Sequence, residues 1–487
     1  MSSVHHFIPN TDDDIAQMLD VIGVRSIEDL LEPIPADIRR DAVLDLPPAL
    51  TEAEAVRLLR GRARQNTAAD ATSFLGAGIY DHYGPAAVDA MLQRSEFYTA
   101  YTPYQAEVSQ GTLQAIYEFQ TMVCELFGMD VANASVYDGS SALTEAVLLA
   151  HAQTGRRRVV YAGPVHPYYR DVARSCTVGI GLEFVEAETE DGAASTESVE
   201  KLVNDDTACI VVQQPNFRGI IEDITPLAEI ADKNGALLIV SANPLALGVL
   251  EAPGRQGADI VIGEGQSIGI AQQFGGPVLG LFAVRDELRR RMPGRLVGRT
   301  LDSRGQQAFV LTLQTREQHI RREKATSNIC TNQNLMALAA TVYLSLVGAE
   351  GLRAIAEASI QNAHYAADEI VKINGFTLAH AKPFAYEFVV RCGRMPDRHP
   401  PPRPRAAYWA ATLGLPSASS GGCIGSGRSG LMLYHAVGMS FSSSTNLVLS
   451  GIFSSPPSTT VRPGLVRLRW KPRSRARLPR RTTRGLL

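Results

Sequence analysis

The chain has 487 residues, of which 45% are hydrophobic and 20% charged, and its formal net charge is -3. This composition is typical of a folded protein with room for two or more domains, and it excludes a collagen-like chain or a repeat array. The six cysteines are scattered and form no C-x-x-C pair, which argues against a disulfide framework and a structural zinc site. We therefore expect a cytoplasmic protein without a metal centre.

The amino terminus does not have the pattern of a secretory signal. Met1–Asp14 ends in three aspartates and has no apolar core. The longest apolar stretch, Leu335–Ala349, contains Thr341 and Ser345 and is shorter than the roughly 20 residues that span a bilayer. We expect this stretch to be a buried helix and the protein to lack a membrane partner.

Charge is divided unevenly along the chain. Residues 391–487 carry 16 Lys+Arg against a single acidic residue, Asp397, and contain 11 of the 27 prolines. Such a composition predicts disorder. A basic arm for nucleic acid is one interpretation, but no aromatic interleaving accompanies the arginines, so we expect no nucleic-acid partner. The other interpretation is a shifted reading frame in a GC-rich gene. Resequencing codons 385–400 would refute it if the frame were intact and close relatives had the same tail.

In chain order, the sequence predicts four segments. Residues 1–70 are helical, with a capping box at Thr51-Glu52-Ala53-Glu54. Residues 71–310 form a large α/β domain, residues 311–392 a helical connection that begins a small α/β unit with a strand at Phe384–Val390, and residues 393–487 an atypical tail. The strands of the large domain are expected at Arg158–Tyr161, Leu182–Val185, Cys209–Gln213, Ala236–Val240, Asp259–Ile262 and Val278–Val284. Their continuous hydrophobicity favours a mostly parallel sheet covered by helices on both faces, with ligands beyond the carboxyl ends of the strands.

A tyrosine-rich loop precedes a helix that we expect to start near Ser109. Tyr98, Tyr101 and Tyr104 are spaced by three, but Pro103 disfavours a helix here. With the neighbouring polar residues Gln105 and Glu107, this loop could either line a pocket for a small zwitterion or simply pack against the core.

A possible phosphate turn lies at Asp138-Gly139-Ser140-Ser141, ahead of a helix predicted to start at Ala142-Leu143. Backbone N–H groups, two hydroxyls and the positive end of a helix bind phosphate well, although Ser141 could equally be a plain N-cap. His166 follows a strand by a few residues and could be structural or stack on a flat ring.

Two groups that a pyridoxal-phosphate site of the aminotransferase type needs are absent. The strand Ala236–Val240 should end in a carboxylate for the pyridinium nitrogen, but Ser241-Ala242-Asn243 follow it. The next strand should deliver the lysine amine, and Gln266 stands there instead. Because a carboxamide cannot form an imine, the pattern indicates a degenerate half-site that needs a second polypeptide.

Thr315–Thr331 is dense in charge. Such runs usually mark a solvated helix face. Here the run could also be a subunit contact, for which the candidates are Arg316, His319, Arg321, Arg322 and Asn328.

Four segments together resemble the alpha chain of the split glycine cleavage system P-protein family: Phe7–Thr11, Tyr101–Glu107, Asn133–Ala142 and Thr315–Thr331. The resemblance runs from about residue 5 to about residue 392. It implies an aspartate-aminotransferase-like fold (PLP fold type I) whose small carboxyl-terminal domain is here truncated or replaced. It also implies that Gln266 takes the place of the Schiff-base lysine, that His166 matches a ring-stacking position, and that Asp138–Ser141 matches a phosphate turn.

The resemblance further implies a partner and a reaction. The enzyme would be glycine dehydrogenase (aminomethyl-transferring), with pyridoxal 5'-phosphate held covalently by a partner beta chain, glycine decarboxylase subunit 2, in a complex of two alpha and two beta chains. Glycine would be decarboxylated and its aminomethyl group passed to the lipoyl group of H-protein. The tyrosine loop is then expected to face the pocket that both chains enclose.

Two alternatives stay open at this point. The chain could be a self-sufficient pyridoxal enzyme that uses another lysine, such as Lys324, or a scaffold subunit without a part in catalysis.

Overall fold

The computed structural model describes residues 9–35, 37–39, 46–66, 78–273, 276–393 and the backbone of 431–435. The chain divides into two compact units, Met1–Ser73 and Phe74–Leu487. The predicted boundaries at 310 and 392 stay predictions. The predicted tail at 393–487 lies outside the described residues, except for the strand β14 (Leu431–His435).

The first unit holds two amphipathic helices with strong start signals. Helix α1 (Asp12–Ile22) and helix α2 (Glu52–Ala63) both begin with a capping box, in which Thr11 pairs with Asp14 and Thr51 with Glu54. The Thr51 box confirms the sequence prediction, whereas the Thr11 box was missed. Neither helix buries a residue within the chain. Their stability therefore comes from capping and local helix propensity rather than from a core.

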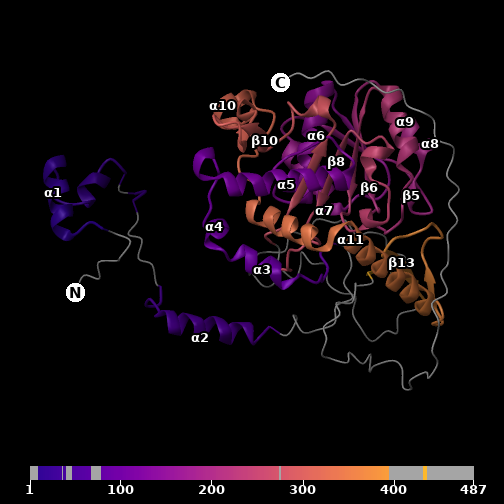
Figure 1. Ribbon diagram of the computed structural model, residues 1–487, viewed down its shortest axis with the longest axis horizontal. Helices are drawn as coiled ribbons and strands as arrows, with labels where there is room; N and C mark the ends of the chain where they lie inside the picture. Colours follow the sequence, from indigo (N-terminus) through magenta and orange to yellow (C-terminus); the bar gives the residue numbers. More distant parts are fainter. Residues whose placement is uncertain are drawn as a thin grey trace. The chain divides into compact units, whose positions relative to one another are not determined.

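The second unit is built around a seven-stranded sheet of order β1-β9-β8-β7-β6-β2-β3 (Figure 1). The strands are β1 (Val131–Ala132), β2 (Arg158–Tyr161), β3 (Glu183–Glu186), β6 (Thr207–Gln214), β7 (Leu237–Ala242), β8 (Ile260–Glu264) and β9 (Gly280–Val284). Strands β8, β7, β6, β2 and β3 are parallel neighbours, while β9 runs antiparallel to both β8 and β1. The mostly parallel sheet is confirmed, whereas the reversed direction of β9 was not predicted.

Helices cover both faces of this sheet. Alternate residues of β6 point to opposite sides: Ile210 and Val212 join one core cluster, and Cys209 and Val211 join the other. The first cluster includes side chains of α5 (Gln110–Phe127), α9 (Ile224–Asn234) and α11 (Asn334–Ile370). The second includes side chains of α6 (Gly139–Thr154) and α7 (Pro167–Thr177). Burial on both faces explains why the strand sequences are continuously apolar.

The remaining elements are short. They are η1 (Glu28–Leu31), α3 (Ala86–Leu92), α4 (Ser95–Tyr98), η3 (Ala106–Val108), β4 (Thr189–Glu190), β5 (Ala193–Ala194), α8 (Thr196–Leu202), η4 (Ala246–Gly248), η5 (Pro253–Gln256), η6 (Asp286–Leu288), β10 (Leu296–Leu301), β11 (Gln307–Thr312), η7 (Gln314–Arg316), α10 (Gln318–Arg321), η8 (Arg322–Lys324), β12 (Phe376–Leu378) and β13 (Glu387–Cys392). Strands β10 and β11 form a hairpin, and β4 pairs with β5.

Helix α11 is long and is bent at Gly348, whose φ of 59° and ψ of -173° are not helical. By length and composition it is the one described helix that could cross a membrane. However, Met336, Ala339 and Tyr343 are buried in the main core, so it is a core helix, as predicted. The prediction of helix from Leu311 onward was wrong, because β11, short turns of helix and irregular backbone precede Asn334.

A second, three-stranded sheet follows α11, in the order β12-β13-β14. All its pairings are antiparallel, and β14 aligns His435 with Glu387. The predicted strand Phe384–Val390 begins three residues too early and ends two residues too early, since β13 covers Glu387–Cys392. The strand β14 was not predicted, because its segment lies within the Gly- and Ser-rich composition that indicated disorder.

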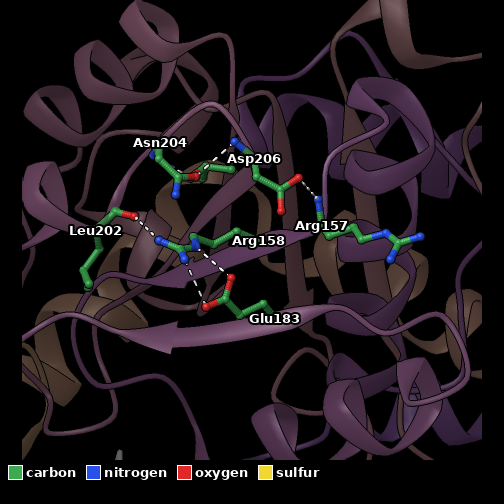
Figure 2. A network of polar contacts seen from close by, with 7 residues as sticks. Arg157, Arg158, Glu183, Leu202, Asn204 and Asp206 are labelled. Atoms are coloured by element: carbon green, nitrogen blue, oxygen red, sulfur yellow. Dashed lines mark hydrogen bonds and ion pairs between the residues drawn. The ribbon is translucent and has the colours of Figure 1, made fainter.

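Polar contacts fix the amino-terminal edge of the main sheet (Figure 2). Arg158 donates two hydrogen bonds to the carboxylate of Glu183 on the next strand, at 2.9 and 3.0 Å, and a third to the Leu202 carbonyl. Asp206 accepts from the backbone N–H of Arg157. These contacts set the starts of β2, β3 and β6, and the opposite edge is left for the candidate site.

Candidate functional site

The candidate site lies where β8 ends, against the first turn of α6. Asp138 is the N-cap of α6: its carboxylate accepts hydrogen bonds from the Ser141 N–H at 2.7 Å and from the Ser140 hydroxyl. The helix thus begins at Gly139, three residues before the predicted start, and Ser141 is not the N-cap. An aspartate cap supplies the same acceptor as a serine cap, so sequence alone did not separate them.

Glu264, the last residue of β8, places its carboxylate on the first N–H group of α6. The Gly139 N–H donates to Oε2 at 3.0 Å, and the N–H groups of Gln266 and Leu279 each donate to Oε1 at 2.9 Å. Burial raises the pKa of Glu264 to about 7, against the opposing effect of these three hydrogen bonds. The predicted phosphate turn therefore already holds a carboxylate of the same chain.

The aromatic part of the site is also satisfied internally. The His166 ring stacks on the Tyr169 ring, with centroids 4.7 Å apart and planes 22° from parallel. Tyr169 packs so closely on Gly139 that a Cβ there would lie 2.2 Å from the hydroxyl oxygen. Burial raises the pKa of Tyr169 well above its usual range, and the nearby Glu264 and Asp138 charges add to the effect. His166 does stack on a flat ring, but that ring is a tyrosine of its own chain.

The two positions expected to hold an amine and a carboxylate carry amide side chains that bind their own backbone. Gln266 is only 4% exposed, and its amide donates to the Ile270 carbonyl at 2.7 Å. Asn243, after β7, accepts a hydrogen bond from the Leu245 N–H and so closes a turn. Lys324, the alternative amine, lies exposed in η8. These residues do not fit pyridoxal phosphate: the amine and the pyridinium partner are missing, and a carboxylate fills the anion position.

The tyrosine loop forms a separate cluster. Tyr104 accepts a hydrogen bond of 3.0 Å from Arg295, and Gln110, in the first turn of α5, anchors the loop to β11 through Phe309. The helix begins after Ser109, as predicted. Tyr98, Tyr101, Gln105 and Glu107 are exposed, with Tyr98 closing the short helix α4 rather than lying in extended chain. The described hydrogen bonds of this loop share no residue with those of the α6 turn.

The charged run is mostly on the surface, with one exception. His319, Arg321, Arg322 and Asn328 are exposed. Arg316 is half-buried, and its guanidinium donates to the carbonyls of Met292, Gly294 and Leu313. These donors of Arg316 therefore bind backbone of its own chain, and the prediction that Arg316 is a subunit contact stays a prediction.

Three ionisable residues with little exposure, Glu145, Glu387 and Arg295, were not singled out from the sequence. Glu145 on α6 is 7% exposed, and burial raises its pKa to about 7 while a hydrogen bond with Ser327 opposes the shift. Glu387 accepts from the Tyr80 hydroxyl, and burial likewise raises its pKa to about 7. Arg295 is 4% exposed, and its Nε has no acceptor. A charged residue within an apolar helix, as at Glu145, was the available signal.

Metal and disulfide chemistry find no support in the described part of the chain. No group of three or more His, Cys, Asp or Glu side chains is placed there to hold a metal ion. The five described cysteines are free, and Cys423 lies outside the described residues.

The fold defines a class: it is the α/β fold of pyridoxal-phosphate-dependent enzymes of fold type I. The chain superimposes on a crystal structure of the glycine cleavage system's glycine decarboxylase (P-protein) in inhibitor-bound form, with a TM-score of 0.74 and 42% sequence identity. That match covers 88% of this chain and 94% of the other. A glutamate decarboxylase from Lactobacillus brevis, 13% identical with a TM-score of 0.59, shares the fold.

The family profile described as glycine cleavage system P-protein matches residues 5–395, and the chain belongs to this family. Two similar relatives are both named probable glycine dehydrogenase (decarboxylating) subunit 1. The one from Chlorobaculum parvum is 56% identical over 386 residues, which are 79% of this chain and 87% of the relative. The one from Thermomicrobium roseum is 55% identical over 393 residues, covering 80% and 88% of the two chains. The resemblance stated from sequence is confirmed.

Proposed function

We propose that this chain is the alpha subunit of a glycine decarboxylase that carries no Schiff-base lysine and completes an active site with a beta chain. The observation that carries the proposal is the site after β8, where Gln266 replaces an amine and Glu264 fills the anion position. A chain with such a site needs a partner to supply the reactive nitrogen. The relatives' name, subunit 1, supports the same arrangement.

The overall reaction releases CO2 from glycine and passes the aminomethyl group to the lipoyl disulfide of H-protein. Pyridoxal 5'-phosphate, covalently held by the beta chain, supplies the electron sink for this decarboxylation. The proposed complex contains two alpha and two beta chains and works in the cytoplasm.

In this proposal the alpha chain contributes residues that line the active-site pocket shared with the beta chain. The loop from Tyr98 to Glu107 presents hydroxyl, amide and carboxylate groups at the surface, and it is held at both ends by α4 and α5. A second chain packed on this loop would exclude water from a reactive carbanion. The exposed Arg321, Arg322 and Asn328 are further candidates for the beta-chain contact.

The test is co-expression with the beta chain, followed by native mass spectrometry and glycine–CO2 exchange. We expect a complex of the two chains to exchange CO2, and each chain alone to be inactive. Full exchange by the beta chain alone would make the alpha chain a scaffold. Borohydride trapping of a phosphopyridoxyl adduct on the isolated alpha chain would establish a self-sufficient enzyme and overturn the proposal.

A further inference from the structure

The site at the carboxyl edge of the sheet is filled by two side chains of its own chain, and we propose that they replace a ligand. Glu264 occupies an anion subsite and Tyr169 an aromatic-ring subsite, and the ligand class that these subsites would otherwise take is a phosphorylated aromatic ring. The closed site is therefore an internal substitute for such a ligand.

The anion subsite is defined by three backbone donors from three different segments. Gly139 begins the 16-residue helix α6, Gln266 follows β8, and Leu279 precedes β9. Their N–H groups converge on one carboxylate, and the positive end of the helix dipole reinforces them. A tetrahedral phosphate presents the same kind of acceptor oxygens as a carboxylate. The geometry is thus that of an occupied oxyanion site, not of a helix end alone.

The ring subsite lies directly beside it. The ring of Tyr169 stacks on His166, and its hydroxyl end lies against the bare Cα of Gly139. Any side chain at position 139 would collide with the tyrosine, since its Cβ would lie 2.2 Å from the hydroxyl oxygen. A flat ring and an anion therefore sit next to each other at the first turn of α6, both supplied by the chain itself.

The substitution has a physical reason. If neither side chain were present, a site without a ligand would leave three backbone donors without acceptors and an unfilled space beside His166. An unsatisfied buried donor destabilises the folded chain, and a cavity adds to that cost. Glu264 and Tyr169 remove both penalties without any bound molecule.

The first test removes the carboxylate. Glu264→Ala is compared with wild type and with Glu145→Ala, a control that deletes another buried carboxyl of the same region, at pH 8 where Glu264 is largely ionised. Inorganic phosphate is titrated while thermal unfolding and phosphorus NMR linewidths are followed. We expect millimolar phosphate to raise the melting temperature of Glu264→Ala and to broaden the phosphorus signal in its presence. Wild type and Glu145→Ala are expected to show neither effect.

The second test opens both subsites. The double variant Glu264→Ala, Tyr169→Ala is titrated calorimetrically with pyridoxamine 5'-phosphate, which cannot form an imine. We expect it to bind this probe at least tenfold more tightly than inorganic phosphate, whereas wild type binds neither. If the double variant does not fold alone, refolding in phosphate or pyridoxamine 5'-phosphate is expected to recover it.

Three results would overturn the inference. The first is that wild type binds phosphate as tightly as Glu264→Ala does. The second is that neither Glu264→Ala nor the double variant responds to phosphate in folding or binding. The third is that the control Glu145→Ala responds to phosphate as strongly as Glu264→Ala does. The inference does not depend on the proposed function: these measurements use the isolated chain, so a failure here leaves the complex and its exchange activity untouched.

Discussion

Arg295 donates a hydrogen bond of 3.0 Å to the Tyr104 hydroxyl, and its guanidinium lies 5.2 Å from the centre of the Tyr104 ring. Arg295 is 4% exposed, and among the described residues its Nε has no hydrogen-bond acceptor. The tyrosine is therefore the main partner of a buried cation, and it ties the tyrosine loop to the start of β10.

Tyr104→Phe should destabilise the isolated chain by about 1–2 kcal/mol, because it removes an acceptor from a buried charged donor while the ring contact stays. Urea unfolding followed by circular dichroism measures the change. Tyr101→Phe is the matched control, since that side chain is 80% exposed, and its effect should stay within about 0.5 kcal/mol. Equal effects of the two variants would contradict the assigned contact.

The exposed tyrosines should matter for assembly rather than for stability. Tyr98→Ala and Tyr101→Ala are expected to leave unfolding of the isolated chain nearly unchanged and to weaken binding of the beta chain about tenfold each, as truncated interface aromatics do. Calorimetric titration with the beta chain measures the affinity. Tyr365→Ala, which removes an exposed tyrosine of α11, is the control. Unchanged affinity in all three variants would place the interface elsewhere.

Stability should carry a pH signature of buried carboxyl groups. The pKa of Glu145 is raised to about 7 in the folded chain by burial, from a usual value of 4.5. Protons therefore bind the folded state more readily, and the stabilisation is fully present below about pH 4.5 and lost as the pH rises through 7. Glu264 and Glu387 contribute in the same direction.

Glu145→Gln isolates this effect, because an amide does not titrate. From pH 5 to pH 8 the stability of wild type relative to the variant should fall by up to about 3 kcal/mol. The quantity to measure is the difference in stability between the two proteins, because His82 also titrates in both. Burial lowers the pKa of His82 to about 4, so its contribution to the stability of the folded chain is lost as the pH falls. A difference that is flat with pH would show that Glu145 is solvated.

A lysine at position 266 should not by itself create a pyridoxal enzyme. In Gln266→Lys the amine would stand at the expected place, but Glu264 and Tyr169 would still fill the neighbouring positions. We expect no adduct after incubation with pyridoxal 5'-phosphate and borohydride, as read by peptide mapping at position 266. The same lysine combined with Glu264→Ala and Tyr169→Ala is expected to be labelled, and labelling of the single variant would contradict this account.

The sheet could be predicted well from sequence because its strands are buried on both faces. The predicted strand Arg158–Tyr161 coincides with β2, and the other predicted strands of the main sheet lie within a few residues of their elements. The direction of β9 could not be predicted, because a buried antiparallel strand has the same continuous apolar pattern as a parallel one. Residues 311–333 were predicted to be helical, but β11 extends to Thr312 and the residues up to 333 form only the short turns η7, α10 and η8.

Only part of the candidate site could be predicted from the sequence. The absence of the lysine and of the pyridinium carboxylate was evident, since Gln266 and Asn243 are where these two charged groups were expected. What fills a site depends on contacts between distant segments, and nothing local marks Glu264 as the partner of Gly139, 125 positions earlier. Tyr169 was likewise one tyrosine among fifteen.

The bend at Gly348 lets one helix, α11, pack in two hydrophobic cores. Its first half packs in the main core, while Ala363 and Ala367 in its second half pack with β13. The backbone angles at Gly348 suit glycine, and no atom crowds the space where a side chain would begin. At about 1.5 Å per residue, the portion beyond the bend is about 30 Å long. Because Leu352, just beyond the bend, is still buried in the main core, the bend sets the direction in which the helix continues toward the small sheet.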